Sequence, residues 1–138
     1  MTTESRTVSA GQFPQEIHVR THLLRADVGP DAGGEDSAPD PHDLFDASLA
    51  ACKSTTAIWY AKRNNLPLER VDTFVERDAS LERKGTYKLT VRLEYHGALS
   101  GADRERIHAA VTKCPLHKLM TTTEVVIETA PLGGREVL

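Results

Sequence analysis

The pattern of apolar and polar positions begins with short, β-like stretches and then changes to a long polar segment. Residues 7–9 and 16–25 are rich in residues that favour strands, and a turn near residues 11–14 separates them. We interpret this part of the chain as two or three strands. Residues 28–41 contain glycines, prolines and acidic residues, with Asp27 directly before them, and almost nothing apolar. This composition predicts a long, solvated loop.

A long helix is predicted to follow the loop and to end near Asn64. Asp40 is a favourable N-cap residue, Pro41 suits the first helical position, and Asp43 places a carboxylate near the positive end of the helix dipole. Small or apolar residues cover most of the helix surface, which predicts a central or interface helix that is buried on most sides. Its broad face contains Phe45, Ser48, Leu49, Cys52, Thr55, Thr56 and Trp59.

Alternation of apolar and polar residues returns after the helix and predicts a β-hairpin. The alternation covers residues 71–75 and 87–95, and residues 83–85 supply the turn. One face of the hairpin is therefore predicted to be solvated. A last strand is predicted over residues 125–129.

A second helix is predicted between the hairpin and the last strand. Ser100 and Asp103 form its amino-terminal signal, and its apolar stripe ends at Cys114. Pro115 disfavours a helical conformation at Cys114, so we expect a further turn over residues 116–120. Cys114 is predicted to point into the structure.

The composition is that of one soluble domain. The chain has 138 residues and a mass of 15.2 kDa, and we expect residues 1–138 to form a single domain. Apolar residues make up 39%, charged residues 27%, and the mean hydropathy is −0.39. The net charge of −3 and the scattered basic residues argue against a nucleic-acid partner. With no membrane-spanning stretch and no signal-peptide core, we expect a cytoplasmic protein.

The two cysteines are the candidates for chemistry. In a cytosolic protein a structural disulfide is rare, so a cysteine pair is inert, redox-active or metal-binding. Sheltered thiols become reactive only beside a specific positive partner. The backbone N–H groups at the start of the turn after Cys114 can stabilise the thiolate form of that cysteine. Cys52 needs a positively charged residue from another part of the chain. The candidates are Arg20, Arg25, His42 and Lys53, of which Lys53 is a poor one because adjacent helical residues point about 100° apart.

Three segments together resemble the OsmC/Ohr family of thiol peroxidases. They are Gly-Gly-Glu-Asp at 33–36, the run from Pro39 through Ala-Ala-Cys52, and Cys-Pro-Leu-His-Lys at 114–118. The resemblance covers essentially the whole chain. It implies an α+β fold with antiparallel sheets packed around a long central helix, in an intertwined homodimer.

The resemblance also implies a stress-response function, the reduction of organic hydroperoxides. Cys52 attacks the hydroperoxide and becomes a sulfenic acid, and Cys114 then condenses with it to a disulfide. An external dithiol reduces the disulfide, and no metal or nucleotide cofactor takes part.

In the family, an arginine from the amino-terminal strands and a glutamate near the start of the long helix activate the first cysteine. The resemblance leaves two counterparts for the arginine, Arg25 and Arg20. At the glutamate position this chain has His42, followed by Asp43. Histidine can bring positive charge to a thiolate, but it cannot reproduce a carboxylate that orients an arginine.

The sequence is also compatible with other functions. Because His42 departs from the family pattern, a non-catalytic protein of the same fold that binds a small ligand is the main alternative. A metal site can also be drawn from Cys52, Cys114, His42 and His117, although no closely spaced cysteine pair anchors it. A cysteine hydrolase is the weakest possibility, because the chain offers no convincing nucleophile motif.

Overall fold

The computed structural model describes residues 1–133, which fold into two antiparallel sheets and three α-helices. This confirms the expected α+β class. The sheets have the strand orders β1-β2-β3 and β4-β5. The strands are Thr3–Thr7 (β1), Gln15–Val19 (β2), His22–Ala26 (β3), Leu68–Asp78 (β4) and Lys88–Gly97 (β5). The helices are Pro41–Arg63 (α1), Gly101–Val111 (α2) and Pro115–Thr121 (α3), with short 3-10 helices at Pro30–Ala32 (η1) and Glu82–Lys84 (η2).

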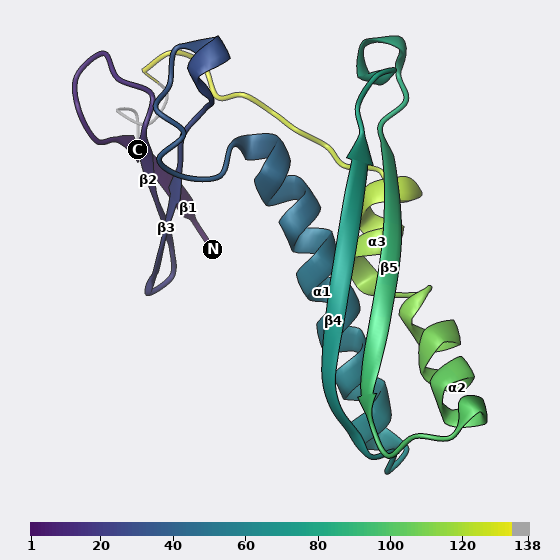
Figure 1. The fold of residues 1–138 in the computed structure, drawn as a ribbon. Helices are drawn as coiled ribbons and strands as arrows, with labels where there is room; N and C mark the ends of the chain where they lie inside the picture. Colours follow the sequence, from purple (N-terminus) through teal and green to yellow (C-terminus); the bar gives the residue numbers. More distant parts are fainter. Residues whose placement is uncertain (134–138) are drawn as a thin grey trace.

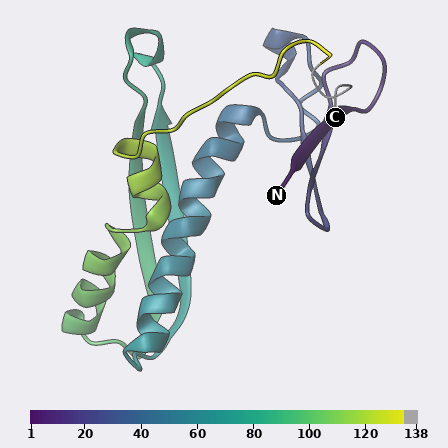
Figure 2. The same ribbon diagram turned by 180° about the vertical axis from the view of Figure 1, so that it is seen from behind.

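The second sheet and the helices form one body, and the first sheet stands apart from it (Figure 1). Helix α1 lies along the β4-β5 hairpin, and α2 and α3 pack against α1. Seen from behind, all three helices lie on the same face of the hairpin (Figure 2). The core of this body consists of the buried residues Ala57, Ala61, Ile107 and Val111, with further apolar side chains around them.

The amino-terminal strands differ in position from the sequence prediction. The prediction of a strand over residues 7–9 is wrong, because β1 already ends at Thr7. The single stretch over residues 16–25 is divided by a tight turn at Arg20, whose φ is 55°. The left-handed backbone of such a turn reverses the chain between β2 and β3.

The loop after β3 is organised by Asp27, which is buried rather than solvated. Its carboxylate accepts hydrogen bonds from the backbone N–H groups of Val28, Glu35 and Ser37 and from the Ser37 hydroxyl. The hydrogen bonds from Ser37 are the main cause that lowers the pKa of Asp27 to about 2. The carboxylate thus takes the place of water as the hydrogen-bond acceptor for these backbone N–H groups. It thereby fixes the path of the chain towards α1.

Helix α1 begins as predicted, but less of its surface is buried. Asp40 and Asp43 form a reciprocal capping box, and Pro41 occupies the first turn. The buried residues follow a single line at four-residue spacing: Leu49, Lys53, Ala57 and Ala61. The expectation of a helix buried on most sides is wrong for one chain, in which Trp59 is 59% exposed. One hairpin and two short helices are too narrow to cover the whole circumference of α1.

The carboxyl-terminal half confirms the hairpin and the second helix but not the last strand. Gly85, with φ 97°, closes the predicted hairpin turn, and Ser100 caps α2. The predicted turn after Cys114 is the short helix α3. Residues 125–129 are not a strand, because no described strand of the chain pairs with them. Within residues 1–133, no helix is long and apolar enough to cross a bilayer.

Candidate active site

The two cysteines lie on neighbouring helices and are both free thiols. Cys52 is half-buried near the middle of α1, and Cys114 is fully buried at the N-cap of α3. The Cys114 Sγ accepts a hydrogen bond from the His117 N–H at 3.4 Å. The prediction that Cys114 points inward is therefore confirmed, and its thiol occupies the amino-terminal end of α3.

Lys53, the residue after Cys52, is turned into the protein interior. Only 4% of it is exposed, and its Nζ donates to the Val111 carbonyl at 2.9 Å. The same Nζ lies 3.0 Å from His117 Nδ1. This contact is not predicted from the sequence. Its only sign in the sequence is the four-residue spacing of Lys53 from Leu49 and Ala57, which places all three on the buried side of α1.

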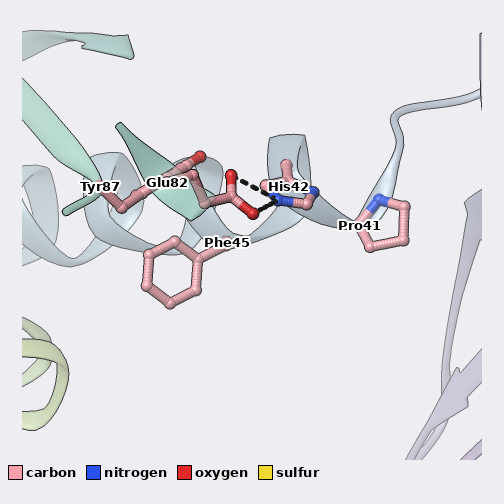
Figure 3. A pocket seen from close by; sticks show the side chains of 5 residues that line it. All are labelled: Pro41, His42, Phe45, Glu82 and Tyr87. Carbon is pink, nitrogen blue, oxygen red and sulfur yellow. Dashed lines mark hydrogen bonds and ion pairs between the residues drawn. The ribbon is translucent and has the colours of Figure 1, made fainter. Parts of the chain in front are cut away.

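His42 lies at the first turn of α1 and pairs with Glu82 of η2. Both Glu82 carboxylate oxygens lie within 3.0 Å of His42 Nε2. The hydrogen bond and the charge of Glu82 raise the pKa of His42. These two residues line an open pocket of about 370 Å³ together with Pro41, Phe45 and Tyr87 (Figure 3). Nothing in the local sequence indicates Glu82, which is brought to this place by the hairpin turn.

A second polar cluster anchors the start of α1 to the hairpin. Arg77 of β4 donates to Asp46 at 2.7 Å and to Asp43 at 2.8 Å. The Tyr87 hydroxyl donates to the other oxygen of Asp46 at 2.7 Å. Burial and the Asp46 carboxylate raise the pKa of Tyr87 to about 12. Asp43 is therefore engaged by Arg77 and by the helix cap, with the Asp40 backbone N–H as the main cause that lowers its pKa.

The two candidate arginines lie on the first sheet, away from the body that carries Cys52 (Figure 1). Arg25 of β3 is exposed and pairs with Glu16 of the adjacent strand at 3.2 Å. Arg20 is exposed in the β2-β3 turn, beside an open, polar pocket that also contains Arg6 and His18. Neither arginine has a hydrogen bond to residues of α1 in the described part of the chain.

A larger cavity of about 600 Å³ lies between α1, β5 and α3. Its wall is mostly apolar and includes Phe45, Leu49, Leu89, Val91 and Met120. Tyr87 lines both this cavity and the smaller pocket at His42. The cavity offers an apolar molecule a place beside α1, and neither Cys52 nor Cys114 is among the residues that line it.

The metal site drawn from the two cysteines, His42 and His117 is not assembled. His42 is engaged by Glu82, and His117 Nδ1 by Lys53. In the described residues, the group of metal-ligating side chains that does come together is Asp72, Glu94 and His96, on the hairpin. Arg70 already donates to Asp72 of that group, so a cationic group is present there.

The fold is similar to several solved structures. An osmotic stress induced and detoxification response protein from Psychrobacter arcticus is 20% identical, with a TM-score of 0.70, over 88% of this chain and 90% of that one. An organic hydroperoxide resistance protein from Legionella pneumophila is 24% identical, with a TM-score of 0.61, over 88% of each chain. OhrB of Bacillus subtilis, an organic hydroperoxide resistance protein, is 23% identical, with a TM-score of 0.59, over 88% of this chain and 90% of that one.

A search of curated proteins gives no match. The family model described as OsmC-like protein, however, matches residues 34–130. This segment contains the capped helix α1, the β4-β5 hairpin and both cysteines. With the motifs of the sequence and the shared fold, the match establishes that the chain belongs to the OsmC-like family.

Proposed function

We propose that the protein is a thiol peroxidase that reduces organic hydroperoxides. The observation that carries the proposal is the pair of free cysteines on two packed helices of an OsmC-like chain. The names of the solved relatives from Legionella and Bacillus, which refer to organic hydroperoxide resistance, support the same substrate class. The apolar cavity between α1, β5 and α3 suits the organic part of such a substrate.

The proposed cycle has three balanced steps. The Cys52 thiolate attacks the outer oxygen of the hydroperoxide, the O–O bond breaks, and the alkoxide takes a proton and leaves as an alcohol. The thiol of Cys114 then attacks the sulfur of the Cys52 sulfenic acid, which forms a disulfide and releases water. A dithiol reductant finally reduces the disulfide by thiol-disulfide exchange. No metal or nucleotide enters the cycle.

The arginine of the proposed site comes from the first sheet. Arg25 or Arg20 would stabilise the thiolate of Cys52 and the developing charge on the leaving oxygen. Because the first sheet stands apart from α1, we propose that the active unit is a homodimer, in which the first sheet of one chain covers the partner's body. In this proposal the His42–Glu82 pair occupies the place of the family's glutamate, with Glu82 supplying the carboxylate.

Steady-state turnover tests the proposal. We expect the protein to consume cumene hydroperoxide in the presence of dithiothreitol, and Cys52→Ser to reduce turnover to background. In the absence of dithiothreitol, Cys114→Ser should still react once at Cys52, because only the second step is lost. Full thiol-dependent turnover by Cys52→Ser would contradict the assignment of Cys52.

A second candidate, a non-catalytic protein that binds a small apolar ligand, is favoured by the histidine at position 42 and by the large apolar cavity. The same experiment separates the two functions. A binding protein would show no turnover and would carry a small apolar molecule after purification, which mass spectrometry of a solvent extract would detect.

A further inference from the structure

Lys53 is a buried cation on a helix face that is otherwise apolar. It shares the buried line of α1 with Leu49, Ala57 and Ala61. Within residues 1–133, no carboxylate lies within ion-pair distance of its ammonium group. A buried charge is costly without a partner, and an apolar residue of similar length would satisfy the packing at less cost. Stability alone therefore does not account for a lysine at this position.

The two groups that hold the Lys53 ammonium also hold Cys114. The Val111 carbonyl accepts from Lys53 Nζ at 2.9 Å and from the Cys114 N–H at 3.2 Å. His117 Nδ1 lies 3.0 Å from Lys53 Nζ, and the His117 backbone N–H donates to Cys114 Sγ at 3.4 Å. The turn that carries Cys114 is thus fixed at both sides by partners of one side chain.

This side chain directly follows Cys52. Its stem starts on α1, and its ammonium reaches the end of α2 and the first turn of α3. His117 itself lies at the surface, with Nδ1 turned towards Lys53. Lys53 therefore connects the backbone beside one cysteine to the backbone beside the other through hydrogen bonds of normal length.

We propose that Lys53 and His117 are positioning residues for disulfide formation between Cys52 and Cys114. This inference rests on the proposed two-cysteine function. In the step concerned, the Cys114 sulfur bonds to the sulfur of the Cys52 sulfenic acid, hydroxide leaves, and the thiol proton converts it to water. The step requires the two Cα atoms to come within roughly 6 Å of each other. The Lys53 bridge holds the Cys114 turn against α1 so that this approach is frequent.

Single-turnover kinetics with cumene hydroperoxide test the inference. Lys53→Met keeps an unbranched side chain that is only one atom shorter and removes the hydrogen-bond donors. We expect Lys53→Met to form the Cys52 sulfenic acid at the wild-type rate but to form the disulfide about tenfold more slowly or worse. Further oxidation of Cys52 to the sulfinic acid should increase as a result. Lys62→Met, at an exposed lysine of the same helix, should behave as wild type.

A second pair of variants keeps the test valid if Lys53→Met does not fold. His117→Leu removes the acceptor for the ammonium, whereas His117→Asn places an oxygen close to the position of Nδ1. We expect His117→Leu to slow disulfide formation like Lys53→Met, and His117→Asn to recover most of the rate. A purely structural role would not give this recovery in the second step alone.

Oxidation by diamide separates this inference from the proposed function. Diamide converts two neighbouring thiols to a disulfide and is itself reduced to a hydrazine, so it requires no peroxidase activity. If the wild type does not react with hydroperoxide but Lys53→Met and His117→Leu still slow the diamide reaction, the proposed function fails and the positioning role stands. Wild-type rates of disulfide formation in both variants, with both oxidants, would overturn the inference.

Discussion

Two neighbouring residues of α1 have different surroundings. Cys52 is half-buried, whereas Lys53, about 100° further around the helix, is almost fully buried and bonded to His117. Helical geometry therefore correctly indicated that Lys53 points away from Cys52. The two cysteines and His42 can be predicted as candidate site residues from residue type and motif. Glu82 and Arg77 were not, because only the folded hairpin brings them to the start of α1.

The His42–Glu82 pair gives a prediction for the pH dependence of stability. Because Glu82 raises the pKa of His42 in the folded state, the pair stabilises the protein below the ordinary histidine pKa. That contribution disappears as the pH rises through the raised pKa. We expect Glu82→Gln to lower the Tm by a few degrees at most at pH 6, and by less at pH 9. A larger loss at pH 9 than at pH 6 would contradict this pairing.

The boundaries of helices and strands can be predicted where residues close together in the sequence form them. The Asp40 cap, the Ser100 cap and the hairpin turn at Gly85 each involve residues within one turn of chain, and all three were predicted. The last strand over residues 125–129 was wrong for a different reason. A strand forms only where another strand pairs with it, and this pairing cannot be predicted from the local sequence.

Gly97 gives a prediction at the end of β5. Its φ is 145°, and a Cβ at this position would overlap the Pro67 carbonyl oxygen. We expect Gly97→Ala to lower the free energy of unfolding by about 2 kcal/mol or more, through backbone strain and this clash. Urea denaturation measures the change.

Gly101 is the matched control for Gly97. It lies in the first turn of α2, and nothing is within 4 Å of a Cβ added there. Gly101→Ala should be neutral or stabilising, because alanine favours the helix. Equal losses in the two variants would contradict the assignment of the Gly97 effect to a local clash.

Several large apolar side chains are exposed on the single chain. Trp59 is 59% exposed on α1, Leu23 is 51% exposed on β3, and Val125, Val126 and Ile127 are 60%, 70% and 85% exposed. These residues lie on α1, on the first sheet and on the unpaired segment after α3. Apolar surface of this extent favours the proposed intertwined homodimer.

A charge on the exposed face of α1 tests the dimer. We expect the wild type to sediment as a dimer at low micromolar concentration and Trp59→Asp to shift it towards the monomer, because the substitution replaces a large, exposed apolar side chain with a charged one that is costly to bury against a partner. Lys84→Asp changes the charge at the exposed tip of the hairpin and should leave the dimer intact. A wild-type protein that sediments as a monomer would contradict the proposed assembly.

The proposed redox pair of Cys52 and Cys114 is tested most directly by counting free thiols and measuring the intact mass after one equivalent of cumene hydroperoxide. For the reduced wild type we predict the loss of both thiols and the mass of an intramolecular disulfide. For Cys114→Ser we predict a sulfenic acid at Cys52, and for Cys52→Ser no reaction. Unchanged thiols in the wild type would contradict this pairing and would favour a binding function for the apolar cavity.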